Sequence, residues 1–123
     1  MPNLFIPKPE KVRLQHMHDA ACDALSFVEN RSRADLDSNR MLTLSLVKCI
    51  EIIGEAAAQV SKDFRLQCPG IPWADIVGMR NRLIHVYYDV NHEIVWQTIQ
   101  QDLPDLIPKI KAILHQEPKS TEE

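Results

Sequence analysis

Apolar residues recur every three or four positions along most of this chain, with polar residues between them, as in amphipathic α-helices. A first helix is predicted to begin near Pro9, because the missing N–H of a proline costs nothing in the first helical turn. Its apolar stripe is formed by Leu14, Met17, Ala21, Ala24 and Val28. Residues 30–37 break the pattern and read as a polar loop, so Asp37 or Ser38 is predicted to cap the next helix.

The second predicted helix, residues 40–61, is apolar on two sides. One stripe is formed by Leu46, Ile50, Ile53, Ala57 and Val60, and the other by Leu42, Cys49, Ile52 and Ala56. A helix with two apolar sides is buried on two sides. The second side could face another helix of the same chain or a second subunit. Small residues at 54–58 would let either neighbour approach closely.

Prolines and a glycine at residues 67–72 interrupt the pattern and separate the second helix from the third. Pro72 suits the first position of that third helix, whose pattern extends into residues 79–88. Its apolar face is formed by Trp73, Ile76, Val77, Leu83 and Ile84. Residues 89–91 then read as a loop, and Asn91 is a suitable cap for a fourth helix.

The fourth predicted helix has one apolar stripe, which contains a proline. The stripe is formed by Trp96, Ile99, Leu103, Leu106, Ile110 and Ile113. Pro104 cannot donate a hydrogen bond to the carbonyl of Gln100. We therefore expect a kink or break near Leu103.

Four or five helices with short connections predict an all-α fold, an antiparallel four- to five-helix bundle. With 123 residues, 45% of them hydrophobic, the chain is most simply one domain, residues 1–123. We expect an ordered core at about 8–116 and a polar tail at 117–123. No apolar run approaches the ~20 residues of a membrane span, and the apolar stretch at the N-terminus is too short for a signal peptide.

Cysteine usage and charge narrow the classes of function. The three cysteines are widely spaced and lack a Cys-x-x-Cys pair, which favours reduced thiols in a cytoplasmic protein over a disulfide framework or a zinc site. The net charge is -3, so no overall basic field attracts nucleic acid. An RNA-binding surface would therefore be a local patch, which more than one chain could assemble.

The segment at residues 79–88 combines chemically active side chains. Arg80 offers a planar fork that binds phosphate oxygens bidentately and stays charged. The imidazole of His85 can give and take a proton near neutrality. Together they would support metal-free RNA cleavage, in which a ribose 2′-OH attacks the adjacent phosphorus.

The spacing of Arg80 and His85 is by itself a weak signal. Arg13 and His18 have the same separation, and an isolated pair of this kind is usually a surface arginine and a histidine near a helix end. On an ideal helix the two side chains would point ~140° apart. The long Arg80 side chain could reach round the helix toward His85. A two-fold dimer could also bring two such segments together across a cleft, and we favour the dimer.

Residues 80–87 read Arg-Asn-Arg-Leu-Ile-His-Val-Tyr, which closely resembles the Arg-(Asn/Asp/His)-x-x-x-His-x-Tyr signature of HepT-like toxins of the HEPN superfamily. The resemblance covers most of residues 10–115. It includes flanking motifs at 53–57, 71–73, 76–79, 95–96, 99 and 102–106.

The resemblance implies a helical homodimer with a metal-independent RNase site at its interface, acting on tRNA or mRNA without a cofactor. Arg80 and His85 fall on the family's catalytic positions, and Asn81 on the polar position after the arginine. Tyr87 falls on the tyrosine that receives AMP from a minimal nucleotidyltransferase, the MntA-like antitoxin of a toxin–antitoxin pair of type II/VII character. Adenylates would add bulk and negative charge where RNA phosphates must bind.

Alternatives stay open at this point. The protein could be a non-catalytic helical dimer that serves a nucleotidyltransferase as binding partner or substrate, or a purely structural dimer. Arg82 could add a phosphate contact or be a surface charge. Glu51 and Glu55 could orient the arginine of the site or form a solvated pair. His18 and Cys22 could share a metal, although packing and surface roles are the more usual reading.

Overall fold

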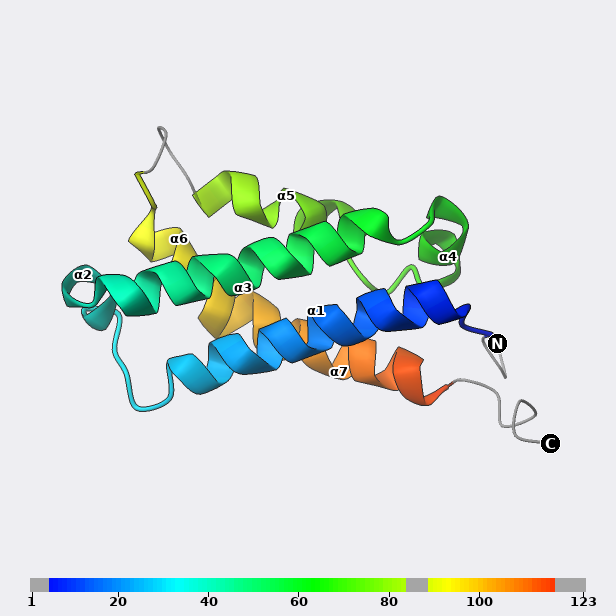
Figure 1. Ribbon diagram of the computed structural model, residues 1–123, viewed down its shortest axis with the longest axis horizontal. Helices are drawn as coiled ribbons and strands as arrows, with labels where there is room; N and C mark the ends of the chain where they lie inside the picture. The colour runs from blue at the N-terminus through cyan, green and yellow to red at the C-terminus, as the bar shows by residue number, and fades with distance from the viewer. Residues whose placement is uncertain (1–4, 84–88, 117–123) are drawn as a thin grey trace.

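A computed structural model describes residues 5–83 and 89–116, and most of these residues lie in helices (Figure 1). The long helices are α1 (Lys8–Phe27), α3 (Arg40–Gln59), α5 (Trp73–Leu83) and α7 (Leu103–His115). Shorter ones are α2 (Asp35–Ser38), α4 (Lys62–Gln67) and α6 (His92–Gln97), and η1 (Thr98–Asp102) is a π-helical turn between α6 and α7.

Successive rods run in opposite directions, and α3 lies between α1 and α5 (Figure 1). The α6–η1–α7 rod returns behind them and packs along α1. The core is built from the predicted stripes, whose largest members, such as Leu14, Ile50 and Leu103, are completely buried. The predicted all-α antiparallel bundle is therefore confirmed. In the part of the chain that the structure describes, no helix is long and apolar enough to cross a membrane.

The start of α3 differs from the prediction. Asn39, not Asp37 or Ser38, caps this helix, and its side-chain oxygen accepts a hydrogen bond from the Leu42 N–H at 3.0 Å. Residues 35–38 form the short helix α2 because Leu36, inside the predicted polar loop, is 1% exposed. Because Leu36 is buried, the segment between α1 and α3 packs against the bundle.

The end of α3 contains a second departure, the helix α4, which the pattern did not predict. Ser61 caps α4, and Phe64 anchors it in the core. Arg65 then folds back on α3: its guanidinium donates to the carbonyls of Ala57, Ala58 and Val60 at 3.0–3.1 Å. Ala57 and Ala58 lie in the last turn of α3 and Val60 is its C-cap, so Arg65, together with the Val60 N–H that also donates to Ala57, satisfies the C-terminal end of this helix.

The fourth predicted helix is interrupted next to Pro104, as predicted. Asn91 caps α6 as expected, accepting from the Ile94 N–H at 3.1 Å. The helix then widens into the η1 turn and resumes at Leu103, next to Pro104. The wider π-helical turn adjusts the backbone hydrogen bonds around Pro104, which has no N–H to donate to a carbonyl of the preceding turn.

Both stripes of α3 are used inside one chain. Leu42, Cys49 and Ala56 of the second stripe are each less than 10% exposed. At Gly54 the backbone of α5 comes close, since an added Cβ would lie 3.4 Å from the Ile76 carbonyl oxygen. Of the two neighbours that the pattern allowed, a helix of the same chain is therefore present. The doubly apolar helix gives no separate support for a dimer.

Candidate functional site

The predicted site residues lie at the end of α5. Arg80, Asn81 and Arg82 occupy its last turn and are exposed. His85 and Tyr87 fall outside the described residues.

A carboxylate of α3 holds Arg80. The Nε of Arg80 donates to Oε2 of Glu51 at 3.1 Å, and the two side chains are 50% and 25% exposed. An ion pair this open to water adds at most about 1 kcal/mol of stability. The pair matters more for the orientation of Arg80 than for stability. It occupies Nε, and both terminal nitrogens have no partner among the described residues. Of the two glutamates considered in the sequence analysis, Glu51 orients Arg80, whereas Glu55 has no bond to it.

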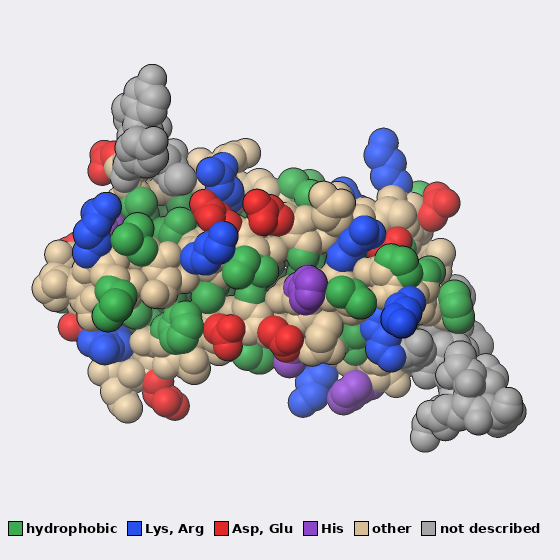
Figure 2. Space-filling model, viewed as in Figure 1, with side chains coloured by type: hydrophobic (Ala, Val, Ile, Leu, Met, Phe, Trp, Pro, Cys, Tyr) green, Lys and Arg blue, Asp and Glu red, His purple; other side chains and the backbone are tan. Residues whose placement is uncertain are grey.

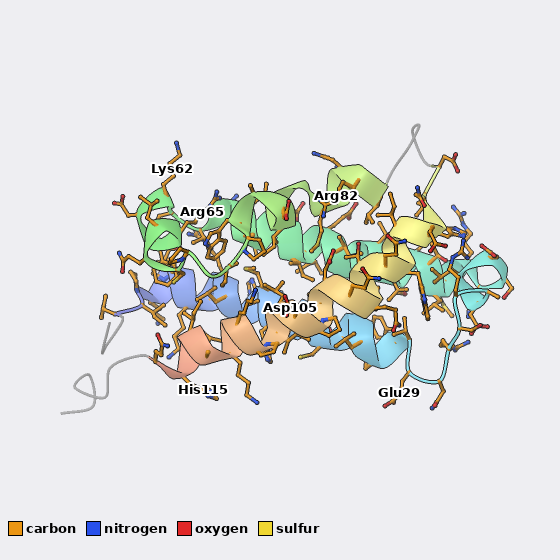
Figure 3. The ribbon with its side chains drawn as sticks, turned by 180° about the vertical axis from the view of Figure 1, so that it is seen from behind. Glu29, Lys62, Arg65, Arg82, Asp105 and His115 are labelled. Carbon is orange, nitrogen blue, oxygen red and sulfur yellow. The ribbon has the colours of Figure 1, made fainter. Side chains whose placement is uncertain are left out.

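Arg82 points away from Arg80. Its Nη1 donates to the Asp75 carbonyl at 3.3 Å, and Figure 3 shows it on the opposite side of the molecule from the α1–α3 face. There it borders a small cavity of about 110 Å³ together with Asp102 and Asp105. A phosphate contact by Arg82 would therefore not belong to the same site as Arg80.

Arg80 and Asn81 border a cleft of about 890 Å³ between α2, α3, α5 and α6. Its buried lining side chains, Leu36, Thr43 and Val47, make the floor. The other lining residues are Asp37, Arg40, Leu44, Glu51, Asp89, Val90 and His92. This volume is within the range of about 300–1,000 Å³ of sites that enclose small ligands.

Ion pairs hold the α2 wall of the cleft. Asp37 accepts from His92 Nδ1 at 2.8 Å and from Arg33 Nη1 at 3.1 Å, and Arg33 also pairs with Glu93. The hydrogen bonds from His92 and then Arg33 hold the pKa of the Asp37 carboxyl below its usual value. Because these pairs join α2 to α6, they connect two segments that are far apart in the sequence.

Both flanks of the segment that carries His85 and Tyr87 lie at this cleft. Arg80 and Asn81 precede it, and Asp89 and Val90 follow it, and these flanking residues line the cleft. The backbone N–H of Asn91 donates to the Leu83 carbonyl at 2.6 Å, which joins the end of α5 to the start of α6.

Sequence reasoning missed Arg40, Asp37 and His92 at this site. One signal was available: Arg40, Leu44, Val47 and Glu51 are spaced i, i+4, i+7 and i+11, so they share one face of α3. No periodicity connects that face with Asp37 or His92, because only the packing of α2 and α6 against α3 brings them there.

The cysteines show little chemical activity. Burial raises the pKa of Cys49 to about 11 and also raises that of Cys68. The sulfur of Cys22 lies 3.8 Å from Nε2 of His18, a loose contact within α1. Among residues 5–83 and 89–116, no group of three or more His, Cys, Asp or Glu side chains is arranged to hold a metal ion.

Comparisons with known proteins agree with this picture. A "Putative RNase" of Caldanaerobacter subterraneus subsp. tengcongensis is 36% identical over 110 residues, which are 89% of this chain and 98% of that protein. A "Probable ribonuclease HepT" of Thermococcus cleftensis is 30% identical over 102 residues, covering 80% of this chain and 92% of that protein. No solved structure gives a significant match. The family model described as "Ribonuclease HepT-like" matches residues 17–113, and the chain therefore belongs to the HepT-like family.

Proposed function

We propose that this protein is a metal-independent RNase, the toxin of a toxin–antitoxin pair, and that Arg80 and His85 carry the reaction. Membership of the HepT-like family supports the class of activity. The observation that carries the assignment of the site is the Glu51–Arg80 pair. It holds at the edge of a cleft a guanidinium whose two terminal nitrogens have no partner among the described residues.

The proposed reaction is an internal transfer of the phosphoryl group. The ribose 2′-oxygen forms a bond to phosphorus while the bond from phosphorus to the 5′-oxygen breaks. His85 takes the proton of the 2′-OH or returns one to the leaving 5′-oxygen, and Arg80 binds the phosphoryl oxygens on which charge builds. The products are a 2′,3′-cyclic phosphate and a 5′-hydroxyl, and Asn81 orients one of the two catalytic side chains.

A homodimer suits this chemistry because one chain supplies few cations to an RNA. The chain has a net charge of -3, and Asp37, Glu51 and Asp89 also line the cleft. Two copies related by a two-fold axis would bring both Arg80 side chains, and with them both His85 residues, to one phosphodiester. The face formed by α1 and α3 exposes Val12, Phe27 and Met41, and Figure 2 shows apolar side chains among charged ones there.

Control by a second protein completes the proposal. A minimal nucleotidyltransferase antitoxin would transfer AMP to Tyr87, which lies in the sequence between Asn81 and Asp89, two residues that line the cleft. The added phosphate would repel the phosphates of RNA from Arg80. The RNA would be tRNA or mRNA.

The test compares wild-type protein with His85→Ala and Arg80→Ala on total RNA in EDTA. We expect cleavage by the wild type, loss of cleavage in both variants, and unchanged helical content and oligomeric mass. Intact mass after co-expression with the nucleotidyltransferase should rise by AMP-sized steps, which Tyr87→Phe abolishes. Undiminished cleavage by His85→Ala would refute the catalytic assignment.

A second candidate is a non-catalytic dimer that serves the nucleotidyltransferase as binding partner or substrate. The acidic residues at the cleft favour it, because they weaken binding of RNA phosphates. This reading predicts no cleavage of any RNA by the unmodified protein and loss of nucleotidyltransferase binding in Arg80→Ala.

A further inference from the structure

The cleft beside Arg80 extends well beyond the candidate catalytic residues. Arg40 and Glu51 are eleven residues apart on one face of α3, about 16 Å along the helix axis at 1.5 Å per residue. Glu51 binds Arg80 at one end of this face, so the cleft leads from the proposed scissile phosphate toward Arg40.

Arg40 is a cation without a structural role. It has no hydrogen-bonding or ion-pair partner among the described residues, and it is exposed at the first position of α3. A positive charge is unfavourable at the positive end of a helix dipole. By contrast, Arg13, Arg33, Arg65 and Arg82 each bond to the protein through their side chains, and Arg31, which also lacks such a bond among the described residues, lies outside the cleft. Arg40 is therefore available to bind an anion.

The floor between the two arginines is apolar. Leu36 and Val47 are buried, and Leu44, 47% exposed, stands over them at the opening. Asn81 and Asp89 at the rim offer an amide donor and a carboxylate acceptor. Cationic groups along a groove suit a single strand, whose phosphates bind the cations. An unstacked base can lie against apolar side chains such as those between the two arginines.

We propose that this cleft binds a short unpaired stretch of RNA next to the scissile phosphate, with a base on Leu44 and Val47 and a phosphate further along the strand on Arg40. The inference rests on the proposed RNase function and narrows its substrate to single-stranded RNA. A paired base is stacked within a duplex and cannot reach the floor, whereas loops and ends present their bases freely.

The experiment measures binding separately from cleavage. The probe is a short 2′-O-methyl oligoribonucleotide, which lacks the attacking hydroxyl and cannot be cut, used alone or annealed to its complement. Fluorescence anisotropy gives Kd across a range of salt concentrations for wild type, Arg40→Gln and Leu44→Glu. The matched controls are Lys48→Gln, which removes a cation from α3 outside the cleft, and Leu66→Glu on the distant helix α4.

Arg40→Gln should lower the slope of log K against log salt by about 0.7, the value for one single-strand phosphate contact. At 0.1 M salt this corresponds to roughly fivefold weaker binding. Leu44→Glu should weaken binding further, both controls should match wild type, and the duplex should bind much more weakly than the single strand.

Equal binding by Arg40→Gln and Lys48→Gln, or equal binding of duplex and single strand, overturns the inference. So does a change of oligomeric mass in Leu44→Glu with RNA binding unaltered in Arg40→Gln, which would make the cleft a contact between copies. Cleavage of total RNA is scored independently. Single-strand binding that depends on Arg40 without any cleavage would refute the RNase proposal alone, and cleavage with no effect of Arg40→Gln would refute this inference alone.

Discussion

Glu51 positions Arg80, and its replacement should separate the orientation of the guanidinium from its charge. Glu51 accepts from Nε of Arg80 at 3.1 Å, and no other described residue bonds the terminal nitrogens, which can bind phosphate oxygens. In Glu51→Gln the amide oxygen can still accept, but without the charge. In Glu51→Ala the acceptor is absent, and the fold should lose less than about 1 kcal/mol because the pair is exposed.

The magnitude follows from the freedom that Arg80 regains. A charge-assisted hydrogen bond is roughly twice as strong as a neutral one, so the glutamine should lose about half of the at most ~1 kcal/mol that the pair supplies, or about twofold in kcat. The alanine variant should lose the whole of the pair, at most about 1 kcal/mol, or up to about fivefold in kcat. KM should fall or stay constant in both variants, because one negative charge leaves the cleft.

The assay is steady-state cleavage of a single-stranded RNA in EDTA, with kcat and KM resolved for wild type, Glu51→Gln and Glu51→Ala. Glu55→Gln is the matched control, since Glu55 lies one turn further along α3 and makes no bond to Arg80. Equal kcat in all four proteins would refute the positioning role. A rise in KM at constant kcat would make Glu51 a binding residue instead.

Three further predictions concern stability and reactivity. Arg65→Ala should lower the free energy of unfolding by about 1–3 kcal/mol, and Arg65→Lys should recover only part of it, because a lysine cannot bond three carbonyls as the fork does; thermal melts test this. The lowered pKa of Asp37 stabilises the fold above that residue's usual pKa, and this contribution is lost as pH falls through the lowered value. Asp37→Asn should therefore be less stable than wild type near neutral pH, and the difference should disappear at low pH, as unfolding curves across the pH range would show. Cys49, with a pKa of about 11, should resist a thiol reagent at pH 8 in the native protein and react once it is unfolded; fast native reaction would contradict its burial.

The helical rods followed from the sequence because amphipathic periodicity is a local property. Asn91 and Pro104 marked a helix start and a break for reasons that act within one turn. The same local view failed at Leu36, where a single apolar residue in a polar segment drew residues 35–38 into a helix and moved the α3 cap to Asn39. Local periodicity also missed α4. Phe64 packs into the core and Arg65 bonds the end of α3, so the contacts that stabilise this helix come from other parts of the chain.

The candidate site divides in the same way. The sequence by itself determined which segment we propose for the chemistry, because Arg80, Asn81, His85 and Tyr87 lie within eight residues and resemble a family signature. Only the tertiary structure decided which partners surround it: Glu51 on Arg80, Arg40 at the far end of the cleft, and the Asp37–His92 pair in its wall. These residues come from helices up to 55 positions apart, and their contacts depend on how α2, α5 and α6 pack against α3. Periodicity along one helix indicates which side is buried, but it carries no information about which other helix supplies the facing charge.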